Sequence, residues 1–188
     1  MMESNEENIS ILLKAIRFAA EKHRNQRRKD KEASPYINHP IAVGETLFQH
    51  GRVRDMVTLV GGILHDTIED TETTPEELEA EFGVEVRAVV QEVSDDKSLP
   101  KEERKRLQIE NAKDASERAK LIKLADKICN LQDIIASPPA NWAVDRKRRY
   151  VEWAQAVIEE IRGTNSELEK RFEGLCKKAL LQLAERSS

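Results

Sequence analysis

Hydrophobic residues recur every three to four positions along most of this chain, and polar residues fill the positions between them. This is the period of an amphipathic helix that buries one face. The first such stretch, built on Ile9, Leu12, Leu13 and Ile16, predicts a helix that runs to about Arg27. The same pattern predicts further helices over residues 40–51, 54–67, 75–82, 84–95, 101–111, 116–136 and 142–162, and a last helix that opens near residue 164.

Several boundaries follow from residues that start or stop helices. Pro40 suits the first turn of a helix, because the missing N–H would have no partner there. Residues 74–77 and 164–167 both have the capping-box pattern, with a threonine followed three positions later by a glutamate. Gly83 and Gly163 each follow a predicted helix and are expected to end it.

The run 56–64 is apolar nearly all round, which is typical of a central, buried helix. Gly61 and Gly62 lie inside it, although glycine weakens a helix. Close packing against a neighbouring element would explain both glycines.

The composition supports an all-α fold. Only 7 glycines and 6 prolines occur in 188 residues, of which 35% are charged and 39% hydrophobic. The chain has no internal repeat or long linker. We therefore predict a single all-α domain over residues 1–188, a bundle of about eight to ten helices whose core covers about residues 9–186.

The sequence also argues against some classes of protein. The first ten residues are acidic and polar, so we expect no secretory signal peptide, and no apolar run is long enough to span a membrane. The two cysteines, Cys129 and Cys176, do not form a metal-type pair. We expect them to be buried free thiols, which indicates a reducing, cytoplasmic location. A net charge of −4 does not favour nucleic-acid binding.

Positive charge is nevertheless concentrated in three clusters, at residues 23–29, 104–106 and 146–149. Each cluster taken alone is best interpreted as a solvated helix face. Three clusters on an acidic protein leave a second interpretation open, a pocket for an anionic small molecule.

The chain has candidate metal ligands. His65 and Asp66 directly follow the most apolar helix, and Asp126 lies on an apolar helix face. A buried carboxylate is costly unless a cation or good hydrogen bonds offset it. A salt bridge from Asp126 to Lys123 or Lys127 is the alternative to a metal. With His39, these residues form a mixed set of imidazoles and carboxylates that suits Mn²⁺, Fe²⁺ or Zn²⁺.

Three more polar residues are expected near such an ion. Glu69 lies four positions after His65 and therefore on the same side of one continuous helix, and Asp70 follows it. Carboxylates in this place could orient a water or move its proton, but an acidic helix end is the plainer alternative. Asn130 is one turn after Asp126 and would point toward the same place.

The arrangement His39, His65-Asp66 and Asp126 resembles the H…HD…D pattern of the HD phosphohydrolase superfamily. Residues 24–40, 61–71, 95–108 and 121–131 are similar to the hydrolase module of the RelA/SpoT family, and most similar to its small single-domain members, the metazoan SpoT homologs. The resemblance covers about residues 9–186.

This resemblance implies a single HD domain that hydrolyses guanosine tetra- or pentaphosphate at the 3′-diphosphate and leaves GDP or GTP and pyrophosphate. Mn²⁺ would be the usual ion, and the synthetase half of long relatives is absent. By matching positions, metal ligands would be His39, His65, Asp66 and Asp126. Catalytic residues would be Glu69, Asp70 and Asn130. Substrate-binding residues would be Arg28, Lys29, Lys101, Trp142, Arg146 and Tyr150.

Three alternatives remain. The same pocket could remove the 2′-phosphate of NADPH, which also joins a purine to a ribose phosphate. A general HD nucleotidase would act on 5′-phosphates, although the basic pair Arg28-Lys29 and the acidic pair Glu69-Asp70 resemble the alarmone hydrolases more. A non-catalytic nucleotide-binding module would be expected to have lost metal ligands, and none is missing here. The oligomeric state is left open.

Overall fold

The structure, a computed structural model, describes residues 2–185, so residue 1 and residues 186–188 of the predicted domain lie outside the described residues. The elements in chain order are α1 (Met2–Lys22), α2 (Asn38–Glu45), the π-helical turn η1 (Thr46–His50), α3 (Met56–Leu64), α4 (Thr67–Asp70), α5 (Pro75–Phe82), α6 (Val84–Val93), α7 (Lys101–Glu110), the 3-10 turn η2 (Ala112–Asp114), α8 (Glu117–Ala136), α9 (Val144–Glu159) and α10 (Ser166–Glu185). Within the described range the only β pairing is an isolated bridge between Arg27 and Pro35. The predicted all-α fold is confirmed.

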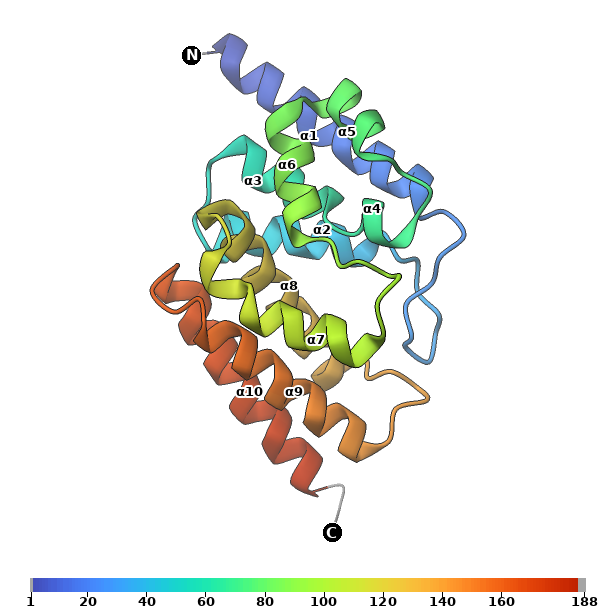
Figure 1. Cartoon of the computed structure of the whole chain (residues 1–188), viewed down its shortest axis with the longest axis vertical. Helices are drawn as coiled ribbons and strands as arrows, with labels where there is room; N and C mark the ends of the chain where they lie inside the picture. Colours follow the sequence, from blue (N-terminus) through green and yellow to red (C-terminus); the bar gives the residue numbers. More distant parts are fainter. Residues whose placement is uncertain (1, 186–188) are drawn as a thin grey trace.

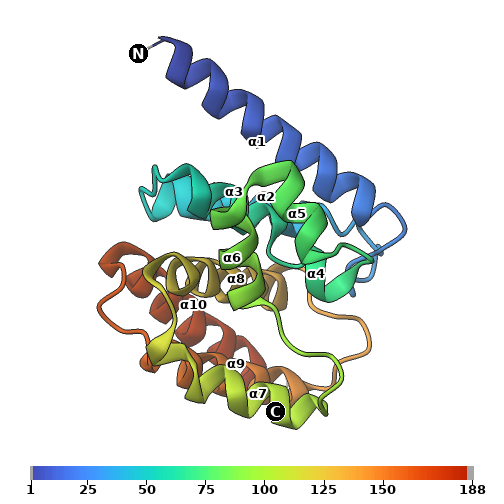
Figure 2. The same cartoon turned by 45° about the horizontal axis from the view of Figure 1, so that its top comes forward.

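Helix α8 lies between two layers of helices (Figures 1 and 2). One side of α8, with Ile122, Ala125 and Cys129, belongs to a hydrophobic cluster that it shares with α1, α2, α3, α5 and α6. Leu124 and Ile128 belong to a second cluster, shared with α9 and α10. Because α8 supplies residues to both clusters, its position is determined by the two layers together.

Helix α3 packs closely inside the first layer, as its two glycines predicted. A Cβ atom on Gly61 would lie 2.8 Å from Val89 Cγ1, and one on Gly62 would lie 2.6 Å from Leu47 Cδ1. These distances are shorter than a van der Waals contact, so only glycine lets α6 and η1 approach α3 this far.

Three predicted helices end early. α1 ends at Lys22 instead of Arg27, and α9 covers Val144–Glu159 instead of residues 142–162. α3 ends at Leu64 instead of Thr67, and a new short helix, α4, starts at Thr67, whose hydroxyl donates a 2.6 Å hydrogen bond to the Leu64 carbonyl. His65 and Asp66 therefore lie at a turn between two helices.

The two predicted capping boxes have different outcomes. The Thr74 hydroxyl accepts a hydrogen bond from the Glu77 N–H at 3.2 Å, as predicted, although the Glu77 carboxylate pairs with Lys22. The prediction at residues 164–167 is wrong by one residue. Asn165 caps α10, because its side-chain oxygen accepts from the Leu168 N–H at 3.1 Å while Glu169 accepts from the Asn165 N–H.

The long connections after α1 (residues 23–37), after α6 (residues 94–100) and after α8 (residues 137–143) lie on the same side of the molecule (Figures 1 and 2). A backbone hydrogen bond of 2.8 Å from Ala140 N–H to the Lys29 carbonyl joins two of them. Within residues 2–185, no helix combines the length and the apolar character needed to cross a membrane.

Candidate active site

The four predicted metal ligands meet in one buried cluster. His39 lies on α2, His65 and Asp66 lie between α3 and α4, and Asp126 lies on α8. His39 Nε2 is 3.1 Å from Asp126 Oδ1 and 3.8 Å from Asp66 Oδ2. His65 Nε2 is 3.1 Å from Asp66 Oδ2 and 3.9 Å from Asp126 Oδ1. Elements far apart in sequence thus bring two imidazole nitrogens and two carboxylate oxygens together.

These donor atoms fit a divalent cation. One ligand atom each from His39, His65 and Asp126 lies within 4.8 Å of the others. In a neutral His65 imidazole, Nδ1 donates to the Gly62 carbonyl at 2.8 Å and Nε2 is the acceptor nitrogen, which is the form that would bind a cation. His65 Nε2 is buried and has no hydrogen-bond partner among the described residues. A cation coordinated at about 2.0–2.2 Å by such ligands would give this nitrogen its partner.

The electrostatics of the cluster favour a positive charge. Burial lowers the pKa of His65, but the neighbouring Asp66 and Asp126 carboxylates outweigh it and raise that pKa to about 9. Burial also opposes the ionisation of the two carboxyl groups. His65 and His39 nevertheless lower the pKa of Asp66, and Lys127 and His39 lower that of Asp126. The carboxylates therefore remain charged, and a cation would be stabilised between them.

Asp126 has protein partners as well as a place in this cluster. The Lys127 ammonium lies 2.8 Å from Asp126 Oδ2, and the Asn130 amide donates to Asp126 Oδ1 at 2.6 Å. The salt bridge that the sequence offered as an alternative is therefore present with Lys127. It holds one carboxylate oxygen while the other faces the imidazoles.

Glu69 lies near the cluster for another reason than the predicted one. The helix of His65 ends before Glu69, so the argument from one continuous helix face is wrong, and α4 places this carboxylate. Glu69 Oε2 accepts a hydrogen bond of 3.1 Å from the Asp95 N–H, and Oε1 lies 3.3 Å from the Arg104 guanidinium. Burial, helped by Asp95 and Asp66, raises the pKa of Glu69 to about 7. A carboxyl group with this pKa can donate a proton near neutral pH.

Asp70 is held from two sides. Its Oδ1 accepts a short hydrogen bond from the Lys97 ammonium, and its Oδ2 lies 3.2 Å from the Tyr36 hydroxyl oxygen. The same hydroxyl donates to Asp66 Oδ2 at 2.6 Å. Burial and the charge of Asp66 raise the pKa of Tyr36 well above its ordinary value, so this phenol keeps its proton.

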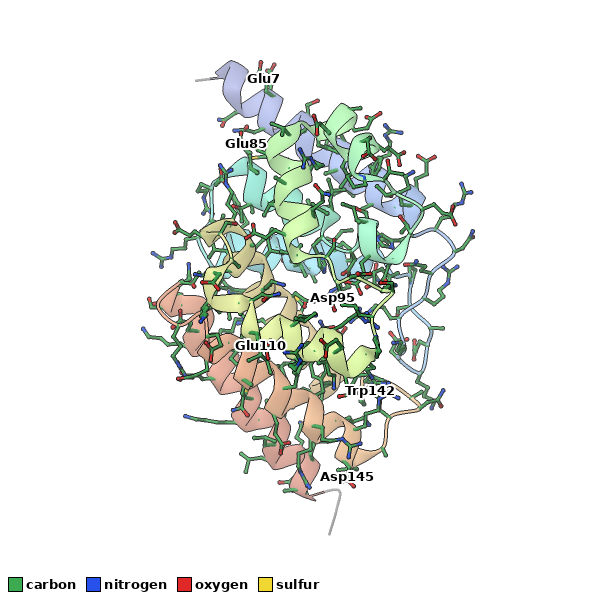
Figure 3. All side chains as sticks on the ribbon, viewed as in Figure 1. Glu7, Glu85, Asp95, Glu110, Trp142 and Asp145 are labelled. Atoms are coloured by element: carbon green, nitrogen blue, oxygen red, sulfur yellow. The ribbon has the colours of Figure 1, made fainter. Side chains whose placement is uncertain are left out.

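The cluster opens into a cavity of about 620 Å³. The predicted site residues that line it are Arg28, Lys29, His39, Asp66, Glu69, Asp70, Asp126, Asn130, Trp142 and Tyr150. The other two predicted substrate residues, Lys101 and Arg146, line an adjoining hollow of about 200 Å³ to which Lys29, Trp142 and Tyr150 also contribute. Figure 3 shows Trp142 just before α9 and Asp95 on the segment between α6 and α7, the two segments that border this hollow.

Some residues of the basic clusters face the proposed site, and others belong to a solvated helix face. Arg28 is only 17% exposed and pairs with Asp133, and its guanidinium also donates to Asn130 at 3.2 Å. Arg146 stacks on the Trp142 ring, with its guanidinium carbon 4.3 Å from the ring centre. Arg106, in contrast, forms ion pairs with glutamates of its own exposed helix face. The clusters at 23–29 and 146–149 thus contribute to the cavity, whereas Arg106 belongs to a solvated surface.

Sequence reasoning missed eleven of the residues that line the cavity, among them Gln26, Tyr36, Lys97, Lys127 and Trp153. Tyr36 and Lys127 had a usable signal, because each is a polar residue next to a predicted ligand segment. Gln26, Lys97 and Trp153 line the cavity because of how the loops and helices pack. No local pattern in the sequence predicts that packing.

Comparison with known proteins gives consistent results. Residues 15–155 match the HD domain family. The human guanosine-3′,5′-bis(diphosphate) 3′-pyrophosphohydrolase MESH1 is 52% identical over 166 residues, which cover 88% of this chain and 93% of the human protein. The zebrafish protein of the same name is 51% identical, with 88% and 92% covered. A solved structure of a metazoan orthologue of SpoT that hydrolyses ppGpp superposes with a TM-score of 0.87 and 45% identity, covering 89% of this chain and 94% of that one.

Proposed function

The chain belongs to the HD domain family, and on that premise we propose that it hydrolyses guanosine 3′,5′-bis(diphosphate) to GDP and pyrophosphate. The observation that carries this proposal is the convergence of His39, His65, Asp66 and Asp126 beside a cavity with cationic and aromatic walls. The metazoan enzymes of this specificity are similar to the chain over nearly their whole length.

The walls suit a purine nucleotide with several phosphates. Trp142 and Tyr150 lie with their ring centres 5.8 Å apart and offer aromatic faces to a base. Lys29, Lys101 and Arg146 border the hollow that adjoins the cavity at these two rings. Burial and the nearby Arg146 lower the pKa of Lys101, which shows that these cations repel one another. A bound diphosphate would relieve this repulsion.

The reaction adds water to the phosphorus attached to the ribose 3′-oxygen and breaks the bond between that phosphorus and that oxygen. We assign the base to Asp70, whose carboxylate pairs with the Lys97 ammonium and would take the proton of the water. We assign the acid to Glu69, because its raised pKa of about 7 suits proton donation to the leaving 3′-oxygen. Asn130, beside Asp126, would position the water or the ribose.

A divalent cation held by the four ligands would polarise the attacked phosphoryl group and acidify the water. Mn²⁺ is our choice of activating ion, and Fe²⁺ or Zn²⁺ would also suit two imidazoles and two carboxylates. Within the described residues both cysteines are free and buried, which supports a place in the reducing cytoplasm.

The test is a parallel assay of the purified protein with Mn²⁺ on guanosine tetraphosphate, NADPH and dGTP. We expect pyrophosphate release from the tetraphosphate. A variant with Asp126→Asn, which keeps the shape of a metal ligand but loses its charge, is the control. Phosphate release from NADPH alone would replace our substrate assignment by a 2′-phosphatase. No release from any substrate by metal-loaded protein would indicate a binding module.

A further inference from the structure

We infer that Tyr36 is a positioning residue of the site, because its hydroxyl joins the metal ligand Asp66 to the catalytic carboxylate Asp70. The assignment of a catalytic role to Asp70 rests on the proposed function, whereas the link to the metal ligand does not. The sequence motifs did not include Tyr36, although its hydroxyl lies between the two carboxylates.

The contacts of the Tyr36 hydroxyl are specific. It lies 2.6 Å from Asp66 Oδ2 and 3.2 Å from Asp70 Oδ2. Asp66 Oδ2 is the same oxygen that faces the imidazoles, at 3.1 Å from His65 Nε2. Because the phenol occupies one lone pair of this oxygen, the other lone pair is directed toward the imidazole nitrogens. The hydroxyl thus sets the orientation in which Asp66 can act as a ligand.

The ring of Tyr36 is held in place by an outer layer of buried polar residues. It stacks on His23, with the ring centres 4.8 Å apart and an angle of 33° between the planes. His23 is 2% exposed, and its Nδ1 lies 2.6 Å from the Gln26 side-chain oxygen. Gln26 donates a short hydrogen bond to the Asp70 carbonyl. This layer explains His23, the buried histidine that is not a predicted ligand.

The backbone of the connection after α1 completes the arrangement. The Tyr36 N–H donates to the Gln26 carbonyl at 3.2 Å, and the His39 N–H donates to the Tyr36 carbonyl at 3.0 Å. Tyr36 is therefore attached to the ligand His39 by its main chain and to the ligand Asp66 by its side chain. An outer partner of this kind commonly changes metal affinity 10- to 100-fold when it is removed.

Tyr36→Phe tests the inference, because it removes one oxygen and leaves the ring that packs on His23. We expect the dissociation constant for Mn²⁺, measured by calorimetric titration of metal-stripped protein, to rise about tenfold or more. At saturating Mn²⁺ we expect kcat for the tetraphosphate to fall about tenfold while KM stays within about twofold. Lys101→Met removes a cation from the hollow that adjoins the cavity and is not lined by the proposed metal ligands. It should raise KM and leave the Mn²⁺ affinity unchanged.

Two outcomes would overturn the inference: a Tyr36→Phe protein with parental Mn²⁺ affinity, or one in which only KM changes. If Tyr36→Phe fails to fold, 3-fluorotyrosine at position 36 with a melting curve equal to that of the parent should retain both Mn²⁺ affinity and kcat. A loss of Mn²⁺ affinity in that protein would also count against the inference. If the parent does not hydrolyse the tetraphosphate, the proposed function fails, and the Mn²⁺ titration still decides the role of Tyr36 toward Asp66.

Discussion

Three of the four proposed metal ligands have a protein partner of their own. The Gly62 carbonyl orients His65, Tyr36 orients Asp66, and Lys127 holds Asp126. Ligands held in this way keep their geometry without the ion, because the hydrogen bond to the partner already fixes each side-chain rotamer. The fourth ligand, His39, differs, since its Nδ1 is buried without a partner among the described residues.

Asp70 can be separated from the metal ligands by substitution. We expect Asp70→Asn to bind Mn²⁺ with near-parental affinity and to lose at least about a hundredfold in kcat, since general-base catalysis contributes roughly 10²–10⁴-fold. Titration calorimetry and steady-state pyrophosphate release would measure the two quantities. Near-normal turnover would remove Asp70 from its proposed role, and loss of metal would make it a ligand.

Glu69 should make stability depend on pH. Its pKa of about 7 in the fold is above its ordinary value of 4.5, so the native state favours the neutral carboxyl group. The stability that this group contributes is complete below about pH 4.5 and is lost as pH rises through about 7. Gln at this position does not titrate. The free energy of unfolding of Glu69→Gln, relative to the parent, should therefore rise by about 3 kcal/mol between pH 4.5 and 8.

Denaturant unfolding at several pH values measures this difference, with Glu167→Gln, a change on the exposed face of α10, as the matched control. The Arg104 guanidinium lies 3.3 Å from the Glu69 carboxyl group and favours its ionised form, which opposes the effect of burial. A relative stability that falls as pH rises would mean that this ion pair dominates and that Glu69 is ionised at neutral pH.

The ligands could be predicted from the sequence, but their partners could not. His65, Asp66 and Asp126 were recognisable because a charged or polar residue on an apolar helix requires compensation. Tyr36 and Lys97 reach the site on connections whose path depends on the whole fold. The first connection, for example, turns through Ala33 at a φ of 49°, a conformation that alanine rarely adopts and that the sequence does not signal.

At the scale of the helices, the hydrophobic period and the helix-breaking residues predicted which segments are helical. The exact ends of the helices depend on local side-chain contacts. The break at His65 matters most, because it turns a predicted single helix into α3, a turn and α4. At this break the Thr67 hydroxyl donates a hydrogen bond to the Leu64 carbonyl. A local hydrogen bond of this kind is invisible to a periodicity argument, since Thr67 is also compatible with a helix interior.

The contact between α3 and α6 makes a specific prediction. Gly61→Ala places a methyl group 2.8 Å from Val89 Cγ1, a β-branched side chain with little freedom to move. We expect the free energy of unfolding to fall by about 1–3 kcal/mol, although alanine favours a helix. Gly174→Ala on α10 is the control, because its Cβ would meet nothing within 4 Å, and it should stabilise by about 0.5–1 kcal/mol. Equal effects at both sites in chemical denaturation would contradict the close packing of α3.

At the scale of the molecule, the proposed metal ligands come from parts of the fold that lie far apart in sequence. His39 and Asp66 come from the first layer, and Asp126 comes from α8, which lies between the layers. An ion at this point therefore links α2, the end of α3 and α8. Its binding energy adds to the stability of the native state, because the unfolded chain has no such cluster.

Removal of metal should lower the melting temperature. An ion at 100 times its dissociation constant stabilises by about 2.7 kcal/mol, and a chain of this length shifts by about 2–4 °C per kcal/mol. We expect chelation to lower the melting temperature of Mn²⁺-loaded protein by roughly 5–10 °C in differential scanning fluorimetry. Asp126→Asn should show the same melting temperature with and without Mn²⁺. An equal response of both proteins would place the ion elsewhere.

The separation of the ligands along the chain also has a consequence for biosynthesis. His39, His65 and Asp66 are translated first, and Asp126 follows only when the ribosome reaches the segment that becomes α8. At ~5–20 residues per second, this delay lasts on the order of ten seconds. A nascent chain in that interval has three ligands and lacks the carboxylate that closes the set. An ion at the proposed site would therefore be acquired late, and its presence in a purified sample would mark polypeptides that were translated at least through α8.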